Sequence, residues 1–114
     1  MSAYLHYIKH AIPAGLLASM MGMAQPAAAE EMTAGSVLTK MKPAELTAYL
    51  AGIAEGLAYA RYVKDGNTTD GMGCINKWFY EPGTMREIFS TFNRFPDHSP
   101  GAVMAAMTQK ACGA

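Results

Sequence analysis

The stretch of sequence that decides the fold is PAELTAYLAGIAEGLAYARYV, residues 43–63. Its apolar residues recur at spacings of three and four, the period of one face of an α-helix; they are Leu46, Leu50, Ile53, Leu57 and Ala60. Pro43 suits the first turn of a helix, because its missing N–H would have no partner there. The turn residues Asp65-Gly66-Asn67 then form a stop signal. The stretch therefore predicts one long amphipathic helix.

Two glycines interrupt this predicted helix. Gly52 and Gly56 each cost about 1 kcal/mol of helix stability relative to alanine. Because they lie four residues apart, they share one flat strip on which another helix or a loop can approach closely. We expect such close packing here, and the alternative is that the helix merely tolerates both glycines.

Helix signals also follow on the C-terminal side. Residues 68–73 have the composition of a loop, and residues 74–80 suit either a helical turn or a short strand. Thr84 and Glu87 have the spacing of a capping box at the start of a second helix, whose inward residues are Ile88, Phe92 and Phe95, with Pro96 at its end. Ser99-Pro100 begins a third helix, with Val103, Met107 and Ala111 inward and Gly113 at its C-cap.

The first residues have the pattern of a secretory signal peptide. Lys9 precedes an uncharged apolar run at 11–24, and Ala27-Ala28-Ala29 offers a cleavage site. The run is too short and too interrupted for a bilayer span, which needs about 20 apolar residues. We therefore predict a signal peptide at 1–29, a partly loose segment at 30–42 with room for one helical turn, and a helical domain at 43–114.

Cleavage after Ala29 would leave 85 residues with a net charge of −1, enough for one domain. The predicted fold is a small all-α, single-domain bundle of about three to five helices, closed by one disulfide. The predicted location is the periplasm. Near-zero charge argues against a nucleic-acid partner, and a cleaved signal leaves no membrane anchor.

Cys74 and Cys112 are the chain's two cysteines. An even count in an exported domain predicts one structural disulfide between them, which stabilises the fold by about 4 kcal/mol in the chain-entropy model. A catalytic thiol with His98 as its base is an alternative that needs one cysteine to stay unpaired. Two distant cysteines and one histidine after the signal do not make a zinc site. No cofactor motif is present, so we expect no metal, no cofactor and no enzymatic activity.

Three aromatic residues follow the first cysteine, namely Trp78, Phe79 and Tyr80. They cannot all face one way, so at least one ring should be exposed. Because Trp and Tyr are enriched at interface hot spots, Trp78 and Tyr80 are candidate partner-contact residues. In the alternative, Trp78 and Phe79 belong to the core and Tyr80 covers it.

The order of motifs resembles the Rap/Tai group of type VI secretion immunity proteins. The resemblance rests on Tyr49-x-x-Gly52-x-x-x-Gly56, Cys74, Pro82-x-Thr84, Phe95-Pro96-Asp97 and Cys112, and covers residues 46–113. It implies a small periplasmic helical protein that binds and blocks a peptidoglycan amidase effector. The chain departs from the group in the insertion 75–81 and in ending Cys112-Gly113-Ala114 rather than Pro-Cys. No effector-contact residue is therefore carried over.

A second function also fits these features. Periplasmic acid-stress chaperones of the HdeA kind are likewise small, helical and closed by one disulfide, and the methionines of this chain suit adaptable binding surfaces. A homodimer is a further expectation. Binding of one partner at neutral pH distinguishes an immunity protein from an acid-activated chaperone.

Overall fold

The structure is a computed structural model that describes residues 31–114. These residues form five α-helices and no strand. The helices are α2 (Ala34–Lys40), α3 (Pro43–Lys64), α4 (Asp70–Tyr80), α5 (Thr84–Arg94) and α6 (Pro100–Cys112). The predicted all-α domain closed by one disulfide is confirmed. The predicted signal peptide at 1–29 lies outside the described residues.

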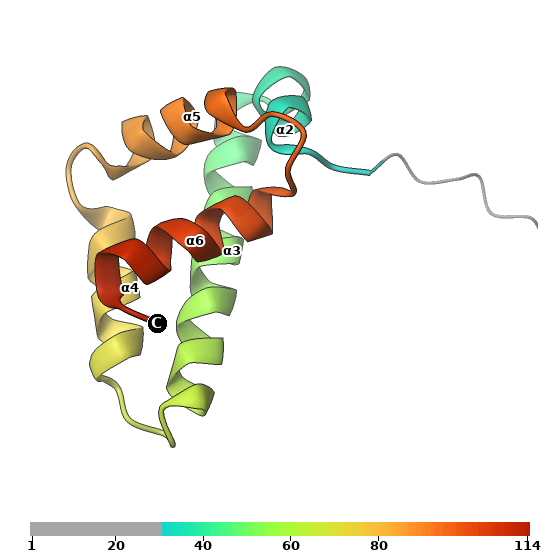
Figure 1. Ribbon diagram of the computed structural model, residues 1–114. Coiled ribbons are helices and arrows are strands. Elements are labelled where there is room, and N and C mark those ends of the chain that lie inside the picture. Colours follow the sequence, from blue (N-terminus) through green and yellow to red (C-terminus); the bar gives the residue numbers. More distant parts are fainter. Residues whose placement is uncertain (1–30) are drawn as a thin grey trace, which may run out of the picture. The chain divides into compact units, whose positions relative to one another are not determined.

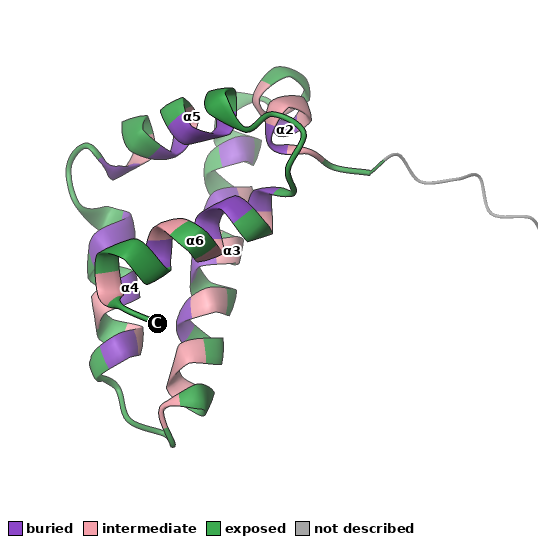
Figure 2. Cartoon of the chain, viewed as in Figure 1, coloured by how far each residue is buried: buried purple, intermediate pink, exposed green. Residues whose placement is uncertain are grey.

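The long helix α3 and the shorter α4 run antiparallel, side by side (Figure 1). Helix α6 crosses this pair and contacts both of its members, while α5 packs on α4 and α6 at one end of the domain. The short α2 closes that end by packing against α5 and α6. Buried residues lie on the helix faces that are turned toward one another (Figure 2).

The core draws on every helix. The largest fully buried side chains are Val37 of α2, Leu50 of α3, Ile88 and Phe92 of α5, and Met104 of α6. Helix α4 adds Ile75, Trp78 and Phe79, which are 3%, 9% and 5% exposed. Burying a side chain of this size stabilises a fold by about 1.5–3 kcal/mol, so each helix is held mainly by its apolar face.

Helix α3 confirms the prediction from residues 43–63 and extends it by one residue, to Lys64. Its deepest residues are Leu46, Leu50, Ala54 and Ala58, spaced by four. The predicted inward position of Ala60 is wrong, because this residue is exposed. The alanines at 54 and 58 take the inward positions, and their small side chains leave room for α4 to approach.

The N-terminal segment is more ordered than predicted. Thr33 and Ser36 cap the start of α2 reciprocally, each side chain accepting from the other's backbone N–H. The backbone N–H of Ala34 donates to the carbonyl of His98 at 2.8 Å, and Ala34 and Val37 are buried. The helical domain therefore begins before residue 43, within the segment predicted to be partly loose.

Residues 70–73 were predicted as loop, but α4 begins at Asp70. Gly71, in its first turn, is buried against α3. A Cβ at this position would lie 2.5 Å from Oδ2 of Asp65 and 2.6 Å from Nε of Arg61. The lack of a side chain at Gly71 therefore permits close packing of α4 on the end of α3. Residues 74–80, for which the sequence suited either a helical turn or a short strand, belong to this helix.

The start of α5 differs from the predicted capping box. Gly83 is the N-cap, with φ of 93°, a left-handed conformation that glycine adopts readily. Thr84 lies inside the helix, where its buried hydroxyl donates to the carbonyl of Trp78 at 2.7 Å. The capping-box prediction is wrong because this bond to the end of α4 engages the threonine. Phe95 was predicted to face inward, but it lies beyond the helix and is 45% exposed.

The start and end of α6 agree with the sequence. The Ser99 side chain accepts from the N–H of Ala102 at 3.2 Å, Pro100 occupies the first turn, and Gly113 is the C-cap with φ of 79°. Val103 is buried as predicted and Met107 is half-buried. Ala111 is exposed, contrary to prediction, because α6 turns Met104 and Thr108 inward instead.

The prediction that α3 packs closely at Gly52 and Gly56 is wrong. Both glycines are exposed, and a Cβ added to either would meet no atom within 4 Å. The chain instead makes its close approaches at Gly71 and at Gly35, where an added Cβ would lie 2.9 Å from Cβ of Pro96.

Two neighbouring glycines of α4 test this account of close packing. We expect Gly71→Ala to lower the free energy of unfolding by about 1–3 kcal/mol, because its methyl group would displace Arg61 and Asp65. The matched variant is Gly73→Ala, which meets no atom within 4 Å and should raise stability by about 1 kcal/mol. Urea unfolding measures both; equal stabilisation by the two substitutions would contradict the packing role of Gly71.

Candidate functional site

The disulfide between Cys74 and Cys112 joins α4 to the last turn of α6, with the two Cα atoms 5.9 Å apart. The predicted pairing is confirmed. Both cysteines of the chain are in this bridge, and no cysteine is free. A thiol nucleophile beside His98 is therefore absent from the oxidised protein.

Arg61 makes a second connection at the same end of the molecule. Its Nε donates to Oδ2 of Asp65 at 2.8 Å, and its Nη1 donates to the carbonyl of Gly113 at 2.8 Å. The side chain thus joins the last turn of α3 to the residue that follows Cys112. Covalent and polar contacts together fix the C-terminal end of α6 against α4 and α3.

The two candidate contact residues have different environments. Trp78 is 9% exposed and Phe79 is 5% exposed, whereas Tyr80 is 78% exposed. The alternative in which Trp78 and Phe79 belong to the core is confirmed, as is the prediction that one ring of the trio is exposed. Tyr80 is free to meet a partner, and Trp78 offers only the part of its indole that borders a surface groove.

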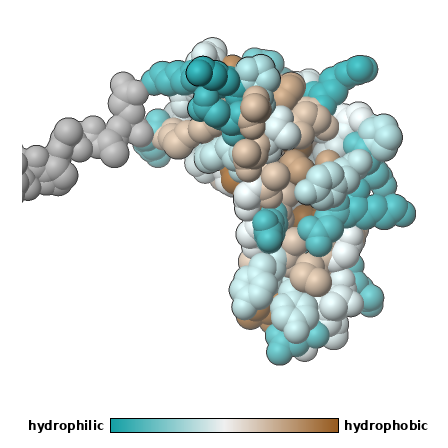
Figure 3. All heavy atoms as spheres, turned by 180° about the vertical axis from the view of Figure 1, so that it is seen from behind, coloured by the Kyte–Doolittle hydropathy of each residue, from teal (hydrophilic) through white to brown (hydrophobic). Residues whose placement is uncertain are grey.

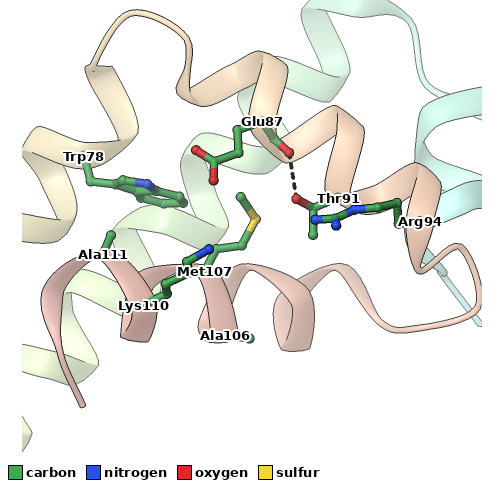
Figure 4. Close-up of a pocket in the computed structure, with 8 residues that line it drawn as sticks. All are labelled: Trp78, Glu87, Thr91, Arg94, Ala106, Met107, Lys110 and Ala111. Carbon is green, nitrogen blue, oxygen red and sulfur yellow. Dashed lines mark hydrogen bonds between the residues drawn. The ribbon is translucent and has the colours of Figure 1, made fainter.

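This groove lies between α5 and α6, with α4 at one end, and has a volume of about 370 Å³. Figure 4 shows the Trp78 ring and the Met107 thioether pointing into it. Glu87, Thr91 and Arg94 of α5 line one side, and Ala106, Lys110 and Ala111 of α6 line the other. We call this site the α5/α6 groove. Its base is apolar and its edges are charged, a composition common at protein interfaces.

The charges of the α5/α6 groove are separated along it. Glu87 and Arg94 lie on opposite sides of Thr91 on α5, with Glu87 toward Trp78 (Figure 4). Within residues 31–114, neither of them nor Lys110 forms an ion pair. The groove therefore has Glu87 and Lys110 toward its Trp78 end and Arg94 at its other end, and no residue of 31–114 forms an ion pair with any of the three.

A second exposed surface lies on α3 and α4. Tyr80 borders a hollow of about 280 Å³ together with Ala51, Glu55 and Asn76. Along the exposed face of α3 lie Gly52, Gly56 and the 65%-exposed ring of Tyr59. Seen from behind the view of Figure 1, apolar and weakly polar residues run down the length of the domain (Figure 3).

The residues described here contain no group of three or more histidine, cysteine or carboxylate side chains that could hold a metal ion. His98 is exposed, with its ring centroid 5.5 Å from that of Phe95. Among the helices of residues 31–114, none is both long and apolar enough to cross a membrane.

Comparisons with protein-family models, with curated proteins and with solved structures found no match to this chain.

The groove residues Arg94, Met107 and Lys110 were not recognised as site residues from the sequence. One signal was present, because Glu87, Thr91 and Arg94 follow the spacing of one helical face. That spacing does not say which helix lies opposite. The groove depends on which face α6 turns toward α5. The sequence pattern predicted a face with Ala111 inward, whereas Ala111 is exposed.

The disulfide holds two parts of the groove, since Trp78 lies one turn after Cys74 and Ala111 directly precedes Cys112. We expect the double variant Cys74→Ser, Cys112→Ser to lose about 4 kcal/mol of unfolding free energy. Urea unfolding followed by the fluorescence of Trp78 measures this loss. The reduced wild-type protein is the control and should match the variant; a loss below about 1 kcal/mol would show that the bridge adds little to the fold.

Proposed function

We propose that this protein is an exported, non-catalytic binding protein that inhibits a peptidoglycan amidase effector in the periplasm, as type VI secretion immunity proteins do. The observation that carries the binding part of the proposal is the α5/α6 groove. It combines Trp78, Met107 and Arg94, residue types that are enriched at interfaces, with charged side chains that form no ion pair within residues 31–114. The amidase partner comes from the motif resemblance alone.

Rigidity of the groove supports tight binding. The disulfide and Arg61 hold the end of α6 in place, and the Thr84 hydroxyl joins the start of α5 to the end of α4. A surface ordered before binding loses less conformational entropy when a partner docks. This preorganisation suits an inhibitor that must capture its target at low concentration.

The inhibitor proposal is tested with the oxidised protein, residues 30–114, used at neutral pH to capture proteins from a periplasmic extract. We expect one cell-wall hydrolase at stoichiometric amount, whose activity falls when the two proteins are mixed. Ala106→Arg should weaken capture and inhibition at least about tenfold, because its side chain would fill the groove.

Ala102→Arg is the matched control, since Ala102 is an exposed residue of the same helix and does not line the groove. It should leave capture and inhibition unchanged. Recovery of no hydrolase, or of one whose activity is unaffected, would contradict the inhibitor proposal. Equal loss in the two variants would place the binding surface elsewhere on the domain.

An acid-stress chaperone is the second candidate, and the placement of methionines favours it. Five of the six methionines in residues 31–114 are at least partly exposed, the exception being Met104. Flexible thioether side chains suit binding to varied apolar surfaces. A chaperone would bind an apolar dye below about pH 3 and suppress aggregation of unrelated proteins there, whereas the inhibitor would show neither effect.

Homodimer formation stays a prediction of the sequence. Sedimentation velocity of the same oxidised protein at increasing concentration tests it directly.

A further inference from the structure

We propose that the α5/α6 groove receives a partner-protein segment that carries an apolar side chain and a neighbouring carboxylate, the carboxylate lying at the Arg94 end. This inference rests on the proposed binding function and adds the chemistry of the segment that the groove takes. It follows from three features of the groove, namely its apolar base, the order of its charges and the lack of ion pairs to these charges within residues 31–114.

The apolar base selects the first part of the segment. Trp78 and Met107 point into the groove (Figure 4), and Ala106 and Ala111 add small apolar surface from α6. An aliphatic side chain placed here would cover the indole edge and the thioether, which otherwise remain in contact with water. Removing this apolar surface from water would contribute favourable free energy to binding.

The order of charges selects the second part. Glu87 lies at the Trp78 end of the groove, and Arg94 lies about 10 Å further along the axis of α5, seven residues later. At the Trp78 end the opposite charges of Glu87 and Lys110 offset one another, whereas Arg94 alone borders the other end and attracts a carboxylate there (Figure 4). The guanidinium of Arg94 can donate two parallel hydrogen bonds to a carboxylate, which would hold the carboxylate at this end of the groove.

The fold gives only a partial reason for the two cations. Arg94 and Lys110 lie in the last turns of α5 and α6, where positive charge is favoured by the helix dipole. The dipole explains the sign of each charge, but it does not require the two side chains to border the same groove. Arg94 also lies 5.7 Å from the ring centroid of Phe95, a contact that leaves its hydrogen-bond donors available.

The test uses three capped dipeptides, acetyl-Leu-Glu-amide, acetyl-Leu-Gln-amide and acetyl-Leu-Lys-amide. Trp78 is the one tryptophan of the chain, so its indole N–H signal in NMR spectra reports on groove occupancy. We expect the Glu peptide to shift this signal and to bind about tenfold more tightly than the Gln peptide, the usual scale of one charge-assisted hydrogen bond. The Lys peptide should bind most weakly.

Two arginines of α5 provide the matched variants. Arg94→Gln should remove the preference for Glu over Gln, while Arg86→Gln, an exposed residue that does not line the groove, should preserve it. Lys110→Gln should reduce the preference without abolishing it. Equal binding of the Glu and Gln peptides by the wild-type protein would overturn the inference, as would the lack of any Trp78 response to the three peptides.

This outcome is separable from the test of the proposed function. If a hydrolase is captured and Ala106→Arg weakens its capture, but the peptides show no carboxylate preference, the inhibitor proposal stands and the inference fails. If the peptides show the preference and no hydrolase is captured, the groove chemistry stands and the partner is of another kind.

Discussion

The attachment of α4 to the end of α6 is the constraint on which the other contacts of this domain depend. The bridge between Cys74 and Cys112 closes a loop of the chain that contains α5. Helix α5 must therefore pack where the chain can still connect the end of α4 to the start of α6. Arg61 connects α3 to the same end of α6 by donating a hydrogen bond to the carbonyl of Gly113. In a domain of this size the apolar core alone provides a narrow margin of stability, and a covalent connection between distant helices compensates for the small number of buried side chains.

Much of the fold was predictable because its signals are local. The apolar period and Pro43 predicted α3, Ser99-Pro100 predicted the start of α6, and the cysteine count predicted the bridge. Each of these features acts within a few residues or follows from redox chemistry, so no knowledge of packing was needed. An N-cap residue such as Ser99 can accept the same hydrogen bond from the first turn of its helix in the folded domain and in an isolated segment.

The errors arose where a distant residue competed for a local group. Thr84 has the spacing of a capping residue, but the carbonyl of Trp78 lies within reach of its hydroxyl and the helix begins at Gly83 instead. Packing against a distant residue also decided which glycines were predicted wrongly. Gly71 was placed in a loop and serves close packing on α3, while Gly52 was expected to pack closely and faces solvent. The sequence alone marks a glycine as unusual; only the neighbouring helix determines whether the space above it is filled.

The same distinction separates the parts of the candidate site. Trp78 was recognised from its residue type, since an aromatic residue beside a disulfide is a reasonable contact, but its burial left only an edge accessible. Arg94 and Lys110 are unremarkable in sequence because cations are common near helix ends. They border the same groove because α5 and α6 form a hairpin, which places Arg94 at one end of the groove and Lys110 toward the other, with Met107 between them (Figure 4). A binding surface made in this way depends on interhelical packing, so substitutions in the core beneath it would change its shape while leaving every groove residue in place.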